Sequence, residues 1–259
     1  MQTVLFHSTI FGPIHSRRLG TSLGINLSPI DGKVCSFDCL YCEAGFNAQG
    51  PGRAGLPTRV EVKRLLEEKL YVMQRNGDPL DVITFSGNGE PTMHPDFEGI
   101  IDDTIALRDQ YFPNVKISVL SNSTRIDRED VCRALTRVDN NLLKLDSALT
   151  STIHQIDRPV SPSFNADDVI SRIAQFGPQC IVQTMFLRGK HGGQLIDNTT
   201  PEEIRALIAA YKRIGPREIT IYSIDRKTPA EELVKVSKEE LQAIADCIVA
   251  ETGIPVQVS

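Results

Sequence analysis

The sequence predicts an α/β fold built on a parallel sheet with six βα units. Short apolar segments alternate with amphipathic helical segments along most of the chain, which is the pattern of repeated βαβ units. The chain has 259 residues, of which 41% are hydrophobic, enough for one large α/β domain with a sizeable core. Six units are too few for a closed eight-stranded barrel. We therefore expect a single domain over residues 1–259.

The first elements follow from turn residues and capping residues. Residues 1–20 contain turn residues and a basic pair, and predict a lead-in rather than a strand. The first strand is predicted at residues 23–27, where apolar residues alternate before a turn. Residues 45–57 are rich in Gly, Ala and Pro and predict a flexible loop. Thr58 and Glu61 have the spacing of a capping box ahead of an apolar stripe, so a helix is predicted to begin there.

Strands and helices alternate from this helix to the end of the chain. The strands are predicted at residues 80–85, 115–120, 142–146, 180–187, 218–223 and 255–258. The helices are predicted at residues 95–110, 127–137, 165–176, 201–213 and 238–251, with a further helical piece from residue 151. Ligands of parallel α/β sheets gather at the carboxyl ends of the strands. We therefore expect the functional residues in the loops that follow the strands.

Composition and charge exclude several classes of protein. The net charge of −5 argues against a broadly basic nucleic-acid surface, although a local basic patch is compatible with it. No apolar run approaches the length of a membrane span, so no membrane partner is expected. The first residues lack the charged and apolar regions of a secretory signal. We therefore expect a cytoplasmic protein in a reducing compartment.

Three of the six cysteines form one CxxxCxxC run, Cys35-Ser-Phe-Asp-Cys39-Leu-Tyr-Cys42. Thiolates are the ligands that iron–sulfur clusters, zinc and copper(I) prefer, and thiols in one short loop can converge on one centre. A structural zinc site needs four ligands, and no fourth cysteine or histidine lies near this run. The run therefore predicts a metal cluster with one open position, and the alternatives are zinc binding and chance clustering.

This run resembles the signature of the radical S-adenosylmethionine (SAM) superfamily, CxxxCxΦC, in which Φ is aromatic and is here Tyr41. Further segments are similar to the branch that includes the wyosine synthases, which modify tRNA. These segments are Ser16-Arg-Arg-Leu-Gly20, Ser22-Leu-Gly-Ile25, Phe85-Ser-Gly-Asn-Gly-Glu-Pro-Thr92 and Tyr222-Ser-Ile-Asp-Arg226. The resemblance implies an α/β fold of the radical SAM type, an open, partial (β/α)6 TIM-like barrel.

The resemblance implies two cofactors, a [4Fe-4S] cluster and SAM. In the superfamily the three cysteines, here Cys35, Cys39 and Cys42, bind three irons, and the amine and carboxylate of SAM chelate the fourth. Reductive cleavage of SAM then gives a 5'-deoxyadenosyl radical that abstracts hydrogen from a substrate. An electron donor such as flavodoxin or ferredoxin is implied as a partner.

The glycine-rich turn after the strand at 80–85 is expected to bind SAM. In the superfamily this turn holds the amino group of SAM through backbone carbonyls and an acidic side chain, and glycines allow the backbone to approach a ligand closely. The residues concerned are Ser86, Gly87, Asn88, Gly89 and Glu90.

Two further residues are candidates for contacts with SAM. By resemblance Tyr41 lies beside the adenine, and the alternative is packing within its own loop. Asn122 follows the strand at 115–120 and has an amide that can bind the ribose hydroxyls or the carboxylate of SAM. The alternative for Asn122 is a cap of the following turn.

Lys144 and Asp146 are candidate catalytic residues. They lie two positions apart on an otherwise apolar strand, and therefore on one face of it. Buried unpaired charges are costly, so these two are expected to pair with each other or to contact a ligand. A purely structural ion pair is the alternative.

Four polar residues are candidates for substrate contacts. Arg17 and Arg18 would bind an anionic group, with a role on the surface rim as the alternative. Gln183 within the strand at 180–187 and Arg226 after the strand at 218–223 are the other two. Cys132, Cys180 and Cys247 have apolar neighbours and are interpreted as small core residues.

We expect a radical SAM enzyme that acts on an unidentified substrate, with a tRNA nucleoside as a candidate. The alternatives are an enzyme that activates glycyl-radical proteins and a non-catalytic iron–sulfur or zinc protein. The turn at Gly87–Pro91 argues against a passive metal protein, which does not need it. Wyosine synthases hold a second cluster with cysteines upstream of the run, and residues 1–34 contain no cysteine. The wyosine reaction itself therefore does not follow from the resemblance.

Overall fold

The structure is a computed structural model and describes residues 4–16 and 20–259. Its strands are β1 (Ile10–Ser16), β2 (Gly20–Ile25), β3 (Val82–Phe85), β4 (Lys116–Ser121), β5 (Asn140–Lys144), β6 (Cys180–His191), β7 (Gln194–Asp197), β8 (Glu218–Ser223), β9 (Leu233–Lys235) and β10 (Val256–Val258). Arg17 and Arg18, two of the candidate substrate residues, lie outside the described residues.

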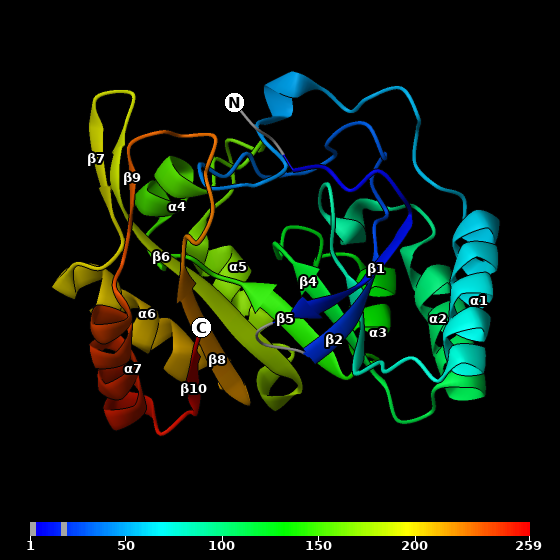
Figure 1. Cartoon of the computed structure of the whole chain (residues 1–259). Helices are drawn as coiled ribbons and strands as arrows, with labels where there is room; N and C mark the ends of the chain where they lie inside the picture. The colour runs from blue at the N-terminus through cyan, green and yellow to red at the C-terminus, as the bar shows by residue number, and fades with distance from the viewer. Residues whose placement is uncertain (1–3, 17–19) are drawn as a thin grey trace.

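One curved sheet carries the fold, as Figure 1 shows. Its strands follow the order β1-β2-β3-β4-β5-β6-β8-β10. Every neighbouring pair from β2 to β10 is parallel, whereas β1 pairs with β2 in antiparallel orientation. No pairing between β1 and β10 closes the sheet within the described part of the chain. The predicted α/β fold with an open, partial barrel is therefore confirmed.

The described part of the chain has seven helices, most of which cover the outer face of the sheet. They are α1 (Arg59–Asn76), α2 (Phe97–Tyr111), α3 (Glu129–Leu135), α4 (Thr150–Ile156), α5 (Ala166–Ile173), α6 (Pro201–Ile214) and α7 (Lys238–Thr252). Figure 1 shows α1, α2 and α3 at one end of the curved sheet and α6 and α7 at the other. The predicted start of α1 is confirmed, because the Thr58 side chain accepts a hydrogen bond from the Glu61 N–H at 3.2 Å.

The two faces of the sheet have different environments because side chains alternate along each strand. Outward residues such as Val119, Leu143 and Val182 join one large apolar cluster with residues of the helices. Each fully buried aliphatic side chain of this kind contributes about 1.5–3 kcal/mol to stability. Inward residues include polar side chains such as Ser22 and Thr84, whose hydroxyls lie 2.8 Å apart. The apolar core is therefore outside the barrel, and the inner face is left for polar contacts and ligands.

Three strands were not expected from the sequence. β1 lies in the predicted lead-in, and the register of the β1–β2 pair shifts between Phe11 and Ile14. β7 and β9 pair with the extended end of β6 on its two sides, and neither alternates clearly between apolar and polar residues.

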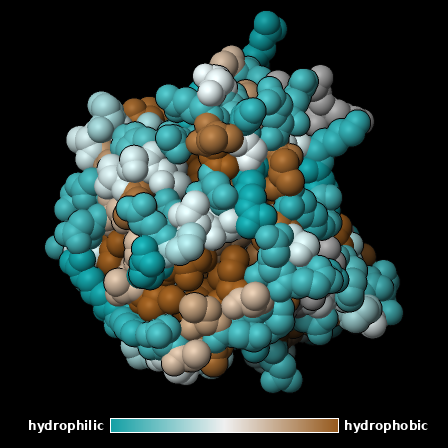
Figure 2. Space-filling view, turned by 90° about the vertical axis from the view of Figure 1, so that its left-hand side faces the viewer, coloured by the Kyte–Doolittle hydropathy of each residue, from teal (hydrophilic) through white to brown (hydrophobic). Residues whose placement is uncertain are grey.

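Figure 2 shows the side of the molecule that carries β7, β9 and α7. Its surface is mostly hydrophilic, with hydrophobic side chains gathered in a hollow of its lower half.

Candidate functional site

The cysteine run lies in the loop between β2 and α1, at the carboxyl ends of the strands. Backbone contacts hold it against two other loops: Val34 forms a β-bridge with Gly89, and Phe37 forms one with Pro159. Cys39 is buried, whereas Cys35 and Cys42 are partly exposed. Neighbouring loops therefore hold the cysteine loop on both sides.

Two of the three thiols have a hydrogen-bond donor beside them. The Asn122 amide nitrogen lies 3.5 Å from Cys35 Sγ, and Lys144 Nζ lies 3.0 Å from Cys39 Sγ. Burial raises the pKa of the Cys35 thiol to about 11, and burial likewise holds the pKa of Cys39 well above its usual value. A bound metal reverses this tendency, because its positive charge keeps coordinating thiols deprotonated.

The thiols suit a multi-iron centre better than a single ion. Within residues 4–16 and 20–259, no three His, Cys, Asp or Glu side chains are arranged to hold one metal ion. The thiolates of a [4Fe-4S] cluster bind different irons, so they do not meet at one point. Three thiols from one loop, with N–H donors beside two of them, therefore fit a cluster, whereas a closed zinc site would need four ligands around one ion.

The glycine-rich turn after β3 depends on two glycines for its close approach to neighbouring loops. A Cβ at Gly89 would lie 1.9 Å from the Val34 carbonyl oxygen, in the loop that leads to Cys35. Gly87 has a φ of 146°, and a Cβ there would lie 2.4 Å from the Asn26 side-chain oxygen. Side chains at either position would push the turn away from the cysteine loop.

Asn88 uses its side chain inside the protein. Its Oδ1 accepts the Phe6 N–H at 2.8 Å, and its Nδ2 donates to the carbonyls of Phe6 and Pro29, each at 2.9 Å. The Asn88 N–H in turn donates to Asn26 Oδ1 at 3.1 Å. Asn88 therefore joins the turn to the N-terminal segment, and what it can offer a ligand is its backbone.

Glu90 is a brace between the glycine-rich turn and the end of β4. Its carboxylate accepts hydrogen bonds from the Asn122 N–H at 2.6 Å, from Ser121 Oγ at 2.9 Å, and from the N–H and hydroxyl of Thr92. Burial raises the pKa of Glu90, although these donors oppose the rise. Ser86, which is partly exposed, holds the start of the turn by donating its N–H to the Ile25 carbonyl at 3.1 Å.

Lys144 is the centre of a buried charge cluster beside the cysteine loop. Its ammonium lies 2.5 Å from Asp157 Oδ1 and 3.3 Å from Asp146 Oδ2. The same ammonium lies 4.8 Å from the centre of the Tyr41 ring and 5.1 Å from that of Phe37. Burial alone would lower the pKa of Lys144, but the two carboxylates outweigh it and hold the pKa well above its usual value. The expected pairing of Lys144 with Asp146 is thus present.

The carboxylates of this cluster have different surroundings. Asp146 accepts a hydrogen bond from the Tyr41 hydroxyl and another from the Met185 N–H at 2.9 Å. Burial raises the pKa of Asp157 to about 7, even though Lys144 lowers it. Asp157 was not singled out from the sequence, and the signal available was the Asp157-Arg158-Pro159 segment beside the cysteine loop. Tyr41 thus connects the cysteine run to this cluster.

The remaining candidates lie further from the thiols. Arg226 is exposed and forms a 2.6 Å ion pair with Glu43, next to Cys42 in the sequence. Both residues line a cavity of about 290 Å³ that Tyr41 and Tyr222 also line. Gln183 lines a different cavity, at the other end of the strands. Cys180 and Cys132 lie in or against the apolar core as expected, whereas Cys247 is exposed, which corrects its interpretation as a core residue.

None of the helices in the described ranges is long and apolar enough to cross a membrane.

A comparison with family models matches residues 30–189 to the radical SAM superfamily. A UPF0026 protein of Helicobacter pylori is 28% identical over 236 residues, which cover 90% of this chain and 71% of that protein. A UPF0026 protein of Methanocaldococcus jannaschii is 30% identical over 240 residues, which cover 89% of this chain and 68% of that protein.

Solved structures of low sequence identity share the fold. A radical SAM methyltransferase from Sphaerobacter thermophilus matches with a TM-score of 0.66 at 14% identity, over 92% of this chain and 65% of that chain. Streptococcus suis SuiB bound to the precursor peptide SuiA has a TM-score of 0.64 at 13% identity; the match covers 91% of this chain but only 48% of SuiB. TYW1 with a lysine–pyruvate adduct has a TM-score of 0.58 at 14% identity, over 90% of this chain and 75% of that chain.

Proposed function

The chain belongs to the radical SAM superfamily and to the UPF0026 family, and we propose that it is a wyosine-synthase-like enzyme that starts hydrogen abstraction on a nucleoside of tRNA. The superfamily uses a [4Fe-4S] cluster and SAM. When bound, these cofactors supply the one-electron cleavage of SAM that gives a 5'-deoxyadenosyl radical. The proposal includes one catalytic domain over residues 1–259, a cytoplasmic location and a flavodoxin-like or ferredoxin-like electron donor.

Contact between the cysteine loop and the glycine-rich turn carries this proposal. Cys35, Cys39 and Cys42 bind the irons of the cluster. The Glu90 N–H donates to the Val34 carbonyl at 3.0 Å, so the turn that binds SAM is fixed directly against the loop that binds the cluster. A cofactor that chelates one iron and contacts the turn would be held by both segments at once. Neither the cysteine loop nor the turn alone would hold both the iron and the amine and carboxylate groups of SAM.

Glu90 and Asn122 position SAM in this proposal. Glu90 already accepts hydrogen bonds from Ser121, Thr92 and Asn122, so its carboxylate fixes the end of β4 relative to the turn. Asn122 Nδ2 donates to Ser36 Oγ at 2.9 Å and lies near Cys35 Sγ, which leaves it at the border between the cluster and SAM. Backbone carbonyls of residues 86–89 bind the amino group of SAM.

In this proposal Lys144, Asp146 and Tyr41 line the active site beside the cysteine loop. The Tyr41 ring packs beside the adenine, and Asp146 fixes the ring through its hydroxyl. Lys144 supplies positive charge to the Cys39 thiolate from 3.0 Å, and hydrogen bonds to cluster sulfurs raise the reduction potential of a cluster. The substrate enters through the cavity lined by Tyr41, Tyr222 and Arg226.

The test of this function is anaerobic. The protein is reconstituted with iron and sulfide, reduced with dithionite and given SAM, and we expect 5'-deoxyadenosine to form. Tritium or deuterium carried by unmodified tRNA should then be found in the 5'-deoxyadenosine, and tRNA binding should weaken steeply with salt. A reconstituted protein that neither binds nor cleaves SAM would contradict the enzyme assignment. SAM cleavage without tRNA binding would contradict only the substrate.

Replacing Glu90 by Gln is expected to weaken SAM binding while iron content stays the same. Glutamine keeps the size of the side chain but loses the charge and one acceptor, and hydrogen bonds to charged groups are worth about 1.5–3 kcal/mol. Loss of that order corresponds to about 10- to 100-fold weaker SAM binding, measured by calorimetry on the reconstituted protein.

Glu203 offers the matched control. It is also buried, and its carboxylate accepts hydrogen bonds from the hydroxyls of Ser147 and Thr152, away from the cysteine loop. The Glu203→Gln variant should lose a similar amount of stability and bind SAM like the natural protein. If the Glu90→Gln variant binds SAM as tightly as the natural protein does, the role proposed for Glu90 is contradicted.

A further inference from the structure

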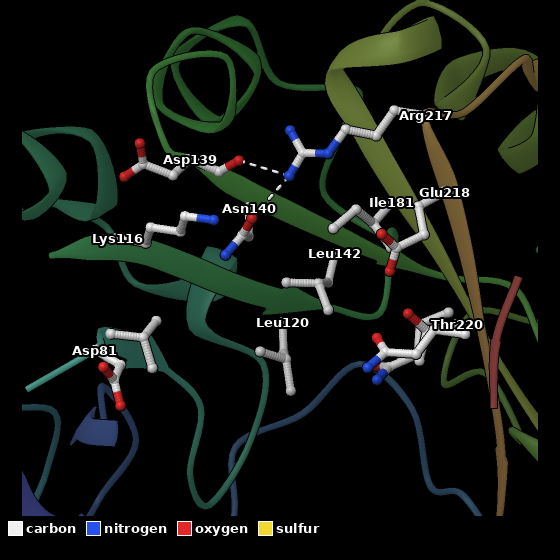
Figure 3. A pocket seen from close by; sticks show the side chains of 13 residues that line it. Asp81, Lys116, Leu120, Asp139, Asn140, Leu142, Ile181, Arg217, Glu218 and Thr220 are labelled. Atoms are coloured by element: carbon white, nitrogen blue, oxygen red, sulfur yellow. Dashed lines mark hydrogen bonds between the residues drawn. The ribbon is translucent and has the colours of Figure 1, made fainter. Parts of the chain in front are cut away.

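A cavity of about 500 Å³ opens on the inner face of the sheet at the amino ends of the strands, the end opposite to the cysteine loop. Figure 3 shows it from close by. Its strand residues lie two or four positions apart within each strand, so they belong to one face of the sheet. The residues that line it are Asp81, Val82, Lys116, Leu120, Asp139, Asn140, Leu142, Ile181, Gln183, Arg217, Glu218, Thr220 and Gln257.

Gln183 is the first sign that a ligand belongs here. Its residue is 6% exposed, and its Nε2 is buried without a hydrogen-bond partner. A buried N–H donor without an acceptor costs free energy, so such groups usually have a partner that is protein, water or ligand. Gln183 lines the cavity, and a ligand acceptor in that space would satisfy the amide.

Two cationic side chains give the cavity its charge preference. Figure 3 shows Lys116 and Arg217 pointing toward Asn140 from opposite sides. Among the described residues, the Arg217 side chain donates only to neutral oxygens, the Asp139 carbonyl and Asn140 Oδ1, each at 2.7 Å. Lys116 has no ion-pair partner among the residues that the structure describes. Both cations therefore retain N–H donors for an anion.

Most of the acidic side chains that line the cavity already accept hydrogen bonds from other residues of the protein. Asp139 accepts the Ile117 N–H at 2.8 Å and pairs with Arg108 at 3.1 Å, and Asp81 accepts the Thr21 N–H at 2.7 Å. Within the described part of the chain Glu218 forms no ion pair, and Figure 3 shows it on the same side of the cavity as Arg217. Its negative charge is expected to weaken anion binding.

The middle of the cavity is apolar. Figure 3 shows the side chains of Leu120 and Leu142 between the charged side chains of Lys116 and Arg217 and the side chain of Thr220. Ile181 adds a third aliphatic wall. Aliphatic side chains pack against the carbon skeleton of a ligand, but they cannot replace the hydrogen bonds that an inorganic ion makes with water. The lining therefore favours an organic anion over phosphate or sulfate.

We propose that this cavity is a second ligand site, separate from the cysteine loop, that binds a small organic carboxylate. Its carboxylate group lies between Lys116 and Arg217, its carbon skeleton packs on Leu120, Leu142 and Ile181, and a further acceptor receives the Gln183 amide. Gln183 pairs in register with Lys144, which lies beside Cys39. Gln183, at the inner end of the proposed site, therefore lies on the strand next to that of Lys144, the centre of the buried charge cluster.

The test is calorimetry with succinate on the reconstituted protein saturated with SAM, so that the first site is occupied. We expect a dissociation constant of about 1 mM or tighter for succinate and weaker binding for inorganic phosphate. Lys116→Gln should weaken succinate binding by about fivefold or more, whereas Lys116→Arg keeps it. Glu218→Gln should strengthen it, because a nearby negative charge is removed.

Lys212→Gln is the matched control, since Lys212 pairs with Glu251 on the outer helices and its removal changes the net charge by the same amount. This variant should bind succinate like the natural protein. Absence of succinate binding up to about 10 mM would overturn the proposal. Unchanged affinity in Lys116→Gln, or phosphate binding as tight as succinate binding, would overturn it as well. None of these outcomes depends on SAM cleavage.

Discussion

Replacing Cys35, Cys39 and Cys42 together by Ala is expected to abolish cluster assembly and SAM cleavage while the protein stays folded. Thiolates supply the metal ligands, and alanine offers none. None of the three cysteines belongs to the large apolar cluster between sheet and helices, so the fold keeps its main source of stability. Iron and sulfide content, the visible absorption of the cluster and 5'-deoxyadenosine formation measure the loss, and circular dichroism measures the fold.

Cys180→Ala is the matched control for this variant. Cys180 is fully buried in β6 and belongs to the apolar cluster, so its replacement costs stability without touching the cysteine run. It should assemble a complete cluster and cleave SAM. Normal iron content or SAM cleavage in the triple variant would contradict the assignment of the cysteine run.

Replacing Lys144 by Met is expected to lower the free energy of unfolding by about 3–5 kcal/mol, because it leaves buried carboxylates without their counter-charge. Asp146 and Asp157 both lie within 3.3 Å of the Lys144 ammonium, and neither is more than 2% exposed in its side chain. Total stabilities of about 5–15 kcal/mol make this a large fraction. Urea unfolding of the protein without cofactors measures the change. Adding Asp157→Asn to the variant should restore part of the loss.

The same substitution should also make the cluster harder to reduce. Lys144 Nζ donates to Cys39 Sγ at 3.0 Å, and a nearby positive charge stabilises the reduced, more negative cluster. A lower reduction potential, measured by electron paramagnetic resonance during a redox titration, is a result that a merely structural lysine would not give. Lys144→Arg keeps the charge and should keep most of the stability, so it serves if the methionine variant does not fold.

Lys33→Met separates burial from contact with the cluster. Lys33 is also buried near the cysteine loop, but its ammonium donates to the Gly45 carbonyl at 2.7 Å, and Asp38 lies at 3.7 Å. This variant should lose stability and lower the reduction potential less than Lys144→Met does, because Lys33 acts on the Cys35 thiol through its charge without contacting a thiol. Equal potentials in the natural protein and the Lys144 variant would contradict the contact between Lys144 and the cluster.

Much of the fold could be predicted because its signals are local. Alternation of apolar residues and the Thr58–Glu61 spacing depend on neighbours in the sequence, and they predicted seven of the ten strands in the described chain and the first helix near their observed positions. β7 and β9 could not be predicted in this way. They are short, partly exposed strands that form only because β6 extends to His191 and offers its two edges to them.

The sequence by itself determined the superfamily and its type of cofactor site, because three cysteines in eight residues need no tertiary structure to lie close together. Which groups surround the thiols was decided by the tertiary structure. Lys144 and Asp157 are far from Cys39 along the chain, and only the parallel order of β2 to β6 brings the ends of these strands to one edge. The same order places Gln183 beside Lys144, at the inner end of the cavity that opens at the amino ends of the strands, because side chains at the same register position on one face of neighbouring strands lie side by side.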